Sequence, residues 1–348
     1  MRAKVRAPSR LGAAVAAGLL VAASGCSAAR PPEPPRPATS TSPAPAGQAG
    51  IAARIRLPAP ASAVATGEGS VWALTRQPAP ALWRIDPSSN RVVGGPTPLP
   101  ADPWSLGVGA GSVWVAPNGA DGRLVRVDAG TGQVSARISA QPVYFGSVLA
   151  FGAGFVWTGN DDERYRRGAT VSKLDPGTNH LVGRPLALGS PQSIAYGAGA
   201  VWVADHAGWL VKIDPRTLEV VARQRLDFGL HGVVATRAGV YVADAHGSHL
   251  LEADPRTAKT RRVAVLPVGP IYPAAGAGSI WSGSAAVWSD ATAQDDRLVR
   301  IDPATLAVTQ TFHLGGNVSA VAVAFGFGSL WATVQPGLVV RLTPAPRG

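Results

Sequence analysis

The chain has 348 residues and a formal charge of +11 at pH 7, but only 15% of its residues are charged, and it holds 41 glycines, 31 prolines and one cysteine. So much Gly and Pro argues against a mainly helical protein, and the single cysteine excludes an internal disulfide or a cysteine-based metal site. The basic residues form no dense run, so the positive charge does not predict nucleic-acid binding.

Residues 1–26 are predicted to be a secretory signal peptide. Four basic residues precede a small apolar segment, residues 11–23, which is too short to span a membrane as a stable helix. The segment leads to Ser24, Gly25 and Cys26, which resemble the lipobox of bacterial lipoproteins, where the cysteine becomes the lipidated first residue of the mature protein. The resemblance implies that Cys26 anchors the protein to the extracytoplasmic face of the cell membrane. The alternative is an ordinary signal peptide, whose cleavage would release a secreted protein without a lipid anchor.

Residues 27–49 are rich in Pro, Ala, Ser and Thr. Such a segment has too few large apolar residues to form a core, so we predict a disordered, extended tether that holds the folded part of the chain away from the membrane. The folded domain is predicted to occupy residues 50–348.

From residue 50 onward the chain repeats one pattern: a glycine turn, a short apolar strand with an aromatic residue, and a third strand that ends near an Asp-Pro pair. A repeat of about 40–45 residues with four short strands is typical of propeller blades. We therefore predict an all-β fold, a seven-bladed β-propeller of four-stranded antiparallel blades. The aromatic residues that mark the blades are spaced 39 to 50 residues apart: Trp72, Trp114, Trp157, Trp202, Tyr241, Trp281 and Trp331.

The first strand of the repeat region is out of phase with the rest. Residues 51–57 alternate like the fourth strands at 220–226 and 308–314, whereas the last repeat stops after a third strand at 338–344. We therefore predict that the N-terminal strand completes the last blade and closes the ring, so that this blade keeps no unpaired sheet edge.

Two further features of the repeat are predicted to be structural. The aromatic residues of the second strands are expected to fill the space between blades. A basic residue two positions before the Asp lies on the same strand face, and we expect a local ion pair in each blade rather than a functional basic ring. These basic residues are Arg84, Arg126, Lys173, Lys212 and Arg300.

Two known families share parts of this pattern. Gly-Ser-Val-Trp-Val at residues 111–115, with Val-Arg-Ile-Asp-Pro-Ala-Thr at 299–305, resembles the YVTN-type β-propeller repeat proteins. This resemblance covers residues 51–348 and implies blades rather than a particular activity. A more distant similarity is to the streptogramin (virginiamycin B) lyases, also seven-bladed, whose second strands end in an acidic residue, as do the strands at Asp205 and Asp244 here. That similarity implies a histidine base near a divalent cation.

The candidate binding residues lie in the loops that join second to third strands and in those that join one blade to the next. In a propeller these loops gather on one face around the central channel, and loops held by a rigid scaffold carry most binding sites. We predict that a ligand or partner binds there through Trp104, Tyr144, Gln192, His206, His231, His246, Tyr272 and Asn317.

Catalysis at the same face is the alternative. His231 is the candidate general base, with Asp205 and Asp244 as carboxylates that orient it. The group Asp244, His246 and His249 comes nearest to a metal site, although loop spacing alone does not establish one. No nucleophile elbow, phosphate-binding loop or paired-carboxylate motif accompanies these residues. We predict no cofactor, with a divalent cation as the alternative.

These features together predict an extracytoplasmic, lipid-anchored and monomeric β-propeller that acts as a binding or scaffold module for a protein or a small molecule. The competing hypothesis is an enzyme, a hydrolase or a C–O lyase of the streptogramin-lyase type, that uses His231 and the nearby Asp residues.

Overall fold

The fold is described from a computed structural model of the chain, which covers residues 50–76, 78–100, 103–117, 122–143, 148–160, 169–226, 229–284, 296–315, 320–334 and 336–345. These residues all belong to one unit of the fold. The predictions for the signal peptide, the tether and Cys26 lie outside the described residues, as do those for Tyr144 and Asn317. Within the described residues, no helix is long and apolar enough to cross a membrane.

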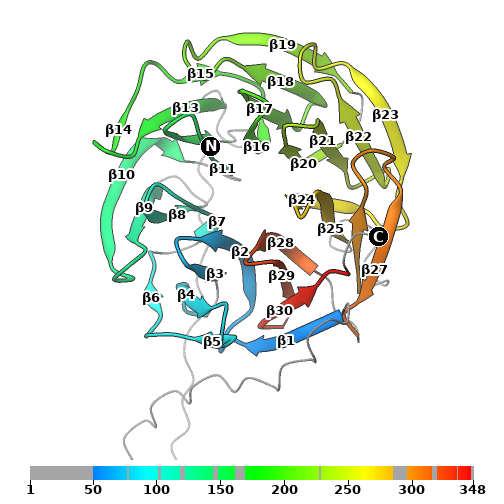
Figure 1. The fold of residues 1–348 in the computed structure, drawn as a ribbon. Helices are drawn as coiled ribbons and strands as arrows, with labels where there is room; N and C mark the ends of the chain where they lie inside the picture. Colours follow the sequence, from blue (N-terminus) through cyan, green and yellow to red (C-terminus); the bar gives the residue numbers. More distant parts are fainter. Residues whose placement is uncertain are drawn as a thin grey trace, which may run out of the picture. The chain divides into compact units, whose positions relative to one another are not determined.

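Seven antiparallel sheets surround a central axis, each with its first strand innermost and its fourth strand at the rim (Figure 1). This arrangement confirms the predicted seven-bladed propeller. The strands of blades 1 to 4 are β2 (Ala61–Gly67), β3 (Ser70–Thr75), β4 (Ala81–Asp86), β5 (Arg91–Val92) and β6 (Thr97–Pro98); β7 (Pro103–Gly109), β8 (Ser112–Pro117), β9 (Gly122–Asp128) and β10 (Val134–Val143); β11 (Val148–Gly152), β12 (Phe155–Asn160), β13 (Thr170–Asp175), β14 (His180–Leu181) and β15 (Leu186–Ala187); and β16 (Pro191–Gly197), β17 (Ala200–Asp205), β18 (Trp209–Ile213) and β19 (Val220–Arg225). Those of blades 5 to 7 are β20 (Leu230–Ala235), β21 (Val240–Asp244), β22 (His249–Ala253) and β23 (Thr260–Val265); β24 (Pro270–Gly276), β25 (Ser279–Ser284), β26 (Arg297–Ile301) and β27 (Val308–His313); and β28 (Ala320–Gly326), β29 (Ser329–Val334), β30 (Leu338–Thr343) and β1 (Gly50–Arg56).

The N-terminal strand closes the ring, as predicted. β1 pairs antiparallel with β30 along its whole length, from Gly50 opposite Thr343 to Arg56 opposite Leu338. The backbone N–H of Leu57 then donates to the carbonyl of Gly337 at 2.8 Å and extends the ladder by one bond. Blade 7 therefore has four strands that come from both ends of the described chain.

Blades 1 and 3 have an interrupted fourth strand. β5 and β6 both pair with β4, and β14 and β15 both pair with β13. The interruption falls on the sequence Val-Gly-x-Pro, residues 93–96 and 182–185, where Gly94 and Gly183 have φ values of 73° and 76°. A left-handed glycine followed by a proline without an N–H takes the chain out of the ladder for a few residues.

The tryptophans of the second strands fill the space between blades, as predicted. All six are at most 1% exposed, and Trp202 of blade 4 packs in one cluster with Leu230 and Val233 of blade 5. In each case the indole N–H donates to the carbonyl of the glycine five residues earlier, at 3.0 to 3.3 Å, so the buried polar atom has a partner within its own blade. The tryptophans are thus part of the core and are not available for a ligand.

The repeated basic residues bridge neighbouring blades, and the predicted local pairs with Asp are wrong. In the six blades with a tryptophan, each basic side chain is the cross-strand partner of that tryptophan and lies 4.9 to 5.7 Å from its ring. Its nitrogen then donates to a backbone carbonyl of the next blade, as Arg84 does to Gly130 and Lys173 to Pro215. The Asp carboxylates instead accept N–H groups of their own turns, such as that of Ser88 on Asp86.

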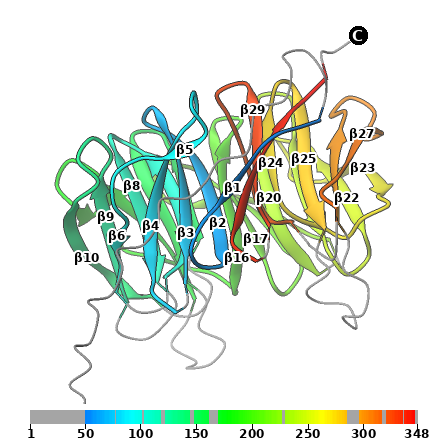
Figure 2. The same cartoon turned by 90° about the horizontal axis from the view of Figure 1, so that it is seen from below.

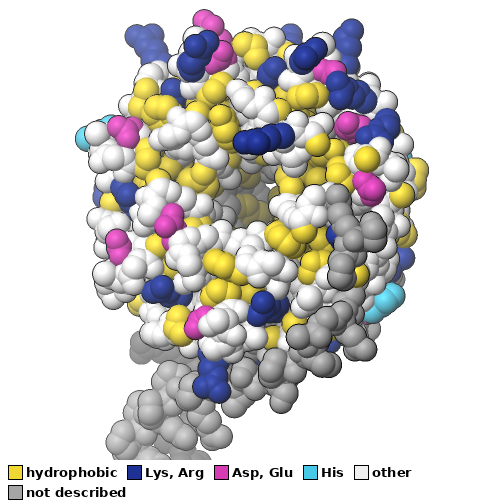
Figure 3. Space-filling model, viewed as in Figure 1, with side chains coloured by type: hydrophobic (Ala, Val, Ile, Leu, Met, Phe, Trp, Pro, Cys, Tyr) yellow, Lys and Arg dark blue, Asp and Glu magenta, His cyan; other side chains and the backbone are white. Residues whose placement is uncertain are grey.

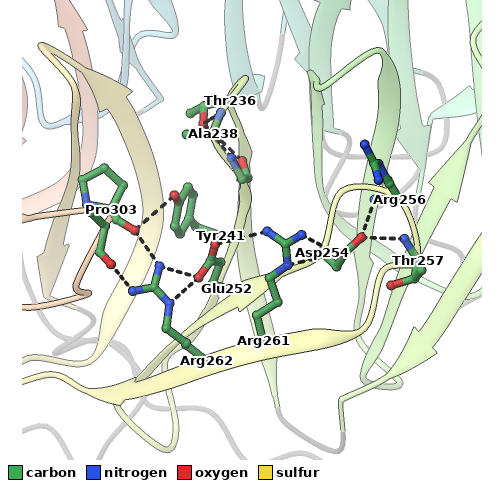
Figure 4. Close-up of polar contacts among 12 residues, drawn as sticks. Thr236, Ala238, Tyr241, Glu252, Asp254, Arg256, Thr257, Arg261, Arg262 and Pro303 are labelled. Atoms are coloured by element: carbon green, nitrogen blue, oxygen red, sulfur yellow. Dashed lines mark hydrogen bonds and ion pairs between the residues drawn. The ribbon is translucent and has the colours of Figure 1, made fainter.

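These bridges form a closed ring, which includes blade 5 although its residues differ. The donor–acceptor distances run from 2.5 to 3.5 Å and link every blade to the next, including blade 7 to blade 1 through Arg341 and the carbonyl of Pro87. In blade 5, Tyr241 and Glu252 take the places of the tryptophan and the basic residue. Arg262 of β23 pairs with Glu252 and donates to Pro303 and Ala304 of blade 6 (Figure 4).

Seen edge-on, the strands run between two faces of the ring (Figure 2). We call the face with the glycine turns (such as residues 67–70) and the Asp turns (such as 86–91) the turn face. The opposite face, with the connections from second to third strands (such as 205–209 and 244–249), is the loop face. On the turn face, neighbouring glycine turns also contact each other, since Glu68 accepts the N–H of Gly111 at 2.9 Å.

Candidate functional site

The candidate site lies at the loop-face ends of blades 4, 5 and 6. Gln192, His231 and Tyr272 lie near the starts of the consecutive inner strands β16, β20 and β24. Asp205 and Asp244 end the second strands β17 and β21, where they lie opposite Pro191 and Leu230. Because these strands begin or end at one face, the fold brings together side chains that are far apart in the sequence.

His231 is the buried centre of the group. It is 6% exposed, and its Nδ1 lies 2.7 Å from the carbonyl oxygen of Gly229. A carbonyl only accepts, so Nδ1 carries the proton of the neutral ring and Nε2 is its basic nitrogen. Burial lowers the pKa of His231 below its ordinary value of 6.5, and this outweighs the opposing effect of the hydrogen bond to Gly229. The neutral form of His231 is therefore favoured at pH 7.

His246 lies against His231 from the next loop of the same blade. The centroids of the two rings are 4.8 Å apart and the rings are tilted by 58°. His246 is exposed, so it presents the edge of this pair to the solvent. Gly229 leaves the room for it, because a Cβ on that residue would lie 2.4 Å from Nδ1 of His246. No sequence pattern connects Gly229 with a histidine seventeen residues later, and its role was not predicted.

Asp244 holds the loop that carries His246. Its side chain is buried, and its oxygens accept hydrogen bonds from the backbone N–H groups of His246 and Gly247, both at 3.2 Å. Oδ2 also lies 2.9 Å from Nδ1 of His249. The carboxylate is thus used within its own loop. Among the described residues, no three His, Cys, Asp or Glu side chains are placed to hold a metal ion.

Asp205 has the corresponding position in blade 4. It is 4% exposed, its Oδ1 accepts the N–H of Trp209 at 2.8 Å, and burial raises its pKa above 3.8. Gly189 packs against it, since a Cβ there would lie 2.7 Å from Oδ2. His206, the next residue in the chain, is exposed, and its backbone N–H donates a hydrogen bond to the carbonyl of Ser190. Within the described residues, neither Asp205 nor Asp244 is hydrogen-bonded to His231, so the carboxylates position loops rather than the imidazole.

Tyr272 adds a strained backbone to this region. Its φ is 43°, and it is the one described non-glycine residue with a positive φ inside a strand rather than at a turn. Its backbone packs on Gly232, where a Cβ would lie 3.0 Å from the nitrogen of Tyr272 and 2.4 Å from Cδ of Pro273. Burial raises the pKa of the Tyr272 hydroxyl. Strain of this kind is concentrated at functional sites, and no residue pattern around Tyr272 predicted it.

The remaining predicted residues divide into one near the histidines and one away from them. Gln192 is half-buried on β16, beside the strand of His231, and its amide donates to the hydroxyl of Ser190 at 3.3 Å. Trp104 belongs to β7 of blade 2, and the guanidinium of Arg76 lies 4.6 Å from the centroid of its ring. The structure therefore groups Gln192, His206, His231, His246 and Tyr272 on three neighbouring blades, while Trp104 lies elsewhere on the ring.

Comparisons with known proteins identify the architecture. The chain is similar to a computationally designed protein, Ika8, with a TM-score of 0.60 over 83% of this chain and 97% of that chain, at 14% identity. It is also similar to the WD40 β-propeller domain of Doa1, with a TM-score of 0.63 over 84% and 96% of the two chains, at 13% identity. No family model and no curated protein matches the sequence. At such low identities the similarity shows the β-propeller fold alone, so function has to be inferred from the residues of the site.

Proposed function

We propose that the protein is an extracytoplasmic binding module, anchored to the membrane through Cys26, that binds its ligand or protein partner at the loop face of blades 4 to 6. The observation that supports this proposal most is the pair of His231 and His246, one buried and neutral and the other exposed beside it. Four of the six histidines of the chain lie in the loop-face segments of blades 4 and 5: His206, His231, His246 and His249.

The hydrogen bonds of the buried Asp and His side chains favour binding over catalysis. Asp205 and Asp244 accept backbone N–H groups of their own loops, and Nδ1 of His231 is held by Gly229. The exposed His206 and His246 and the half-buried Gln192 present hydrogen-bonding groups around a rigid scaffold. A polar surface with fixed donors and acceptors, on loops held by buried anchors, suits recognition of a polar ligand or peptide.

The binding proposal is tested by removing one half-buried and one exposed side chain of the site. Gln192→Ala with His246→Ala should abolish capture of the ligand or partner from detergent-solubilised native membranes, measured by cross-linking and mass spectrometry, and leave the melting temperature nearly unchanged. Asp214→Ala, on the turn face, is the matched control: it removes a turn carboxylate that accepts two backbone N–H groups and should lower stability while sparing capture. Capture lost in Asp214→Ala and kept in the double variant would overturn the proposal.

The membrane anchor is tested separately. If Cys26 carries lipid, Cys26→Ser should move the protein from the membrane fraction to the soluble extracytoplasmic fraction, and the protein should no longer partition into the detergent phase. A variant that keeps the partitioning of the unmodified sequence would contradict the anchor without bearing on the binding face.

A lyase is the second candidate, and one observation favours it. Because Nδ1 of His231 donates to Gly229, Nε2 is a basic nitrogen held in a fixed direction, which is what proton abstraction requires. The test is to incubate the protein with a streptogramin B lactone, with and without Mg²⁺, and to follow ring opening by mass spectrometry. Ring opening that is lost in His231→Gln would establish the activity, and an unchanged lactone would reject it.

A further inference from the structure

A second candidate site lies at the rim between blades 3 and 4, next to the turn face and on a different part of the molecule from the histidines. A crevice of about 400 Å³ separates the interruption between β14 and β15 from the Asp turn of blade 4. Three cationic side chains line it, Lys173, Arg184 and Arg216, and no acidic side chain does. Its apolar lining comes from Val182, Pro185, Leu186 and Leu218.

Lys173 places a buried positive charge at this crevice. It is 6% exposed, its Nζ donates to the carbonyl of Pro215 at 2.7 Å, and the nitrogen lies 3.9 Å from the centroid of the Phe155 ring. Among the described residues, its partners are this carbonyl and the rings of Phe155 and Trp157, and no carboxylate pairs with it. The Asp214 carboxylate is close enough to interact electrostatically with this ammonium, but no hydrogen bond joins the two. A desolvated ammonium whose hydrogen-bond and ring partners are all neutral favours an anion nearby.

The two arginines are available in the same crevice. Arg184 is exposed and forms no hydrogen bond or ion pair with any residue that the structure describes. The side chain of Arg216 is 88% exposed, and its Nε lies 3.9 Å from Oδ1 of Asp214. That carboxylate already accepts the N–H groups of Arg216 and Thr217, at 2.7 and 3.4 Å, so it belongs to the turn.

The interface between blades 1 and 2 shows that the fold does not require the positive charges of Arg184 and Arg216. Blade 1 has the same Val-Gly-x-Pro interruption, and its bridging residue Arg84 occupies the place of Lys173. Gly95 stands where blade 3 has Arg184, and Gly130 stands where blade 4 has Arg216. The basic residues elsewhere on the drawn face are scattered around the ring (Figure 3). The two arginines are thus additions to a repeated backbone that forms without them.

We propose that the crevice binds a phosphomonoester whose organic group is apolar. Three cations beside the single carboxylate of Asp214 leave an excess of positive charge that suits a dianion, and a guanidinium matches two phosphate oxygens at once. The crevice is larger than a phosphate needs and lies within the usual volume range for small-molecule sites. Leu186 and Leu218 supply apolar surface beside the charges, which suits the organic part of the ligand.

Phenyl phosphate is the probe for this site, titrated into the full-length protein at low ionic strength by isothermal titration calorimetry. It should bind more tightly than inorganic phosphate, and phenol should show no binding. Arg184→Gly and Arg216→Gly should each weaken phenyl phosphate binding by about tenfold, because each removes a charge-assisted contact. Arg237→Gly, which removes another exposed arginine on blade 5, is the control and should change nothing.

The blade 1–2 interface offers the converse experiment. Gly95→Arg with Gly130→Arg, placed in the Arg184→Gly background, should restore binding, since neither glycine has a positive φ and a Cβ at Gly95 meets no atom within 4 Å. The proposal is wrong if phenyl phosphate fails to bind, if Arg237→Gly weakens binding as much as Arg184→Gly, or if the grafted arginines restore nothing. Equal affinity for phosphate and phenyl phosphate would reject the apolar part of the ligand.

Discussion

Blade 5 and the six other blades make the same contact with the next blade through different residues. Elsewhere a lysine or arginine lies over a tryptophan and reaches a turn carbonyl, as Lys212 does beside Trp202. In blade 5 the tryptophan becomes Tyr241, and its hydroxyl contacts Pro303 directly. The comparison shows that the repeat preserves a donor to the next turn carbonyl, while the residue that supplies it changes.

The same blade differs from the others at its opposite end. Its loop-face segment contains Asp244, His246 and His249, and its inner strand contains His231. The altered turn-face contact keeps blade 5 joined to blade 6 through Arg262 and Glu252 (Figure 4). Blade 5 therefore keeps a donor to the next blade, as the other blades do, while it contributes most of the titratable groups of the candidate site.

The largest expected effect comes from removing a tryptophan in an ordinary blade. Trp202→Ala empties a fully buried site between blades 4 and 5 and removes the indole N–H bond to Gly197, so we expect a loss of about 3–5 kcal/mol in the free energy of unfolding. Chemical denaturation measures it. The control is Trp209→Ala in the same blade, where the ring is only half-buried under Arg223 and the loss should be smaller. Equal losses would mean that the inter-blade position is not special.

A smaller effect is expected from the blade 5 contact. Glu252→Ala removes the carboxylate that pairs with Arg262 and should cost about 1–3 kcal/mol in unfolding free energy, since Glu252 is buried but Arg262 is partly exposed. Glu252→Arg with Arg262→Gln recreates the pair Arg300 and Gln310 of blade 6 and should be more stable than Glu252→Arg alone. A double variant as unstable as that single variant would show that blade 5 does not tolerate the arrangement of the other blades.

The smallest effect is a pH dependence that distinguishes the Asp turns of blades 4 and 5. The pKa of Asp254 is lowered from 3.8 to about 2 by the N–H groups of Thr257 and Arg256 and by the guanidinium of Arg261. Its stabilising contribution is complete above 3.8 and is lost as the pH falls towards 2. Asp254→Asn should therefore flatten the dependence of the unfolding free energy on pH in that window more than Asp214→Asn does. Arg261 donates a hydrogen bond to the Asp254 carboxylate, whereas Arg216 only approaches Asp214 to 3.9 Å. Equal flattening would show that Arg261 contributes nothing.

Much of the fold could be predicted because each blade repeats local signals. The spacing of the aromatic residues marked the blades, and the alternation in residues 51–57 showed that the first strand belongs to the last blade. The partner of the repeated basic residue was predicted wrongly for a physical reason. It is a backbone carbonyl in the next blade, such as that of Pro215 for Lys173, and a carbonyl leaves no trace in the residue types.

The candidate site was predictable only as a set of loop positions. Assigning loops to faces placed His231 and His246 in the same region, and their rings are indeed neighbours. The conditions that make this possible were invisible in the sequence: the space left by Gly229, and the left-handed backbone of Tyr272. Both depend on tertiary packing, which leaves no signal in the residue types of one sequence.

The closure of the ring makes proteolytic resistance depend on synthesis of the final strand. Until residues 338–343 are present, β1 lacks its partner and blade 7 exposes a sheet edge. A chain cut short before that point also lacks Ala345, the acceptor that joins Arg300 of blade 6 to the last blade. Such chains should be degraded rather than accumulate as partial rings, so that closure acts as a check on the completeness of each molecule.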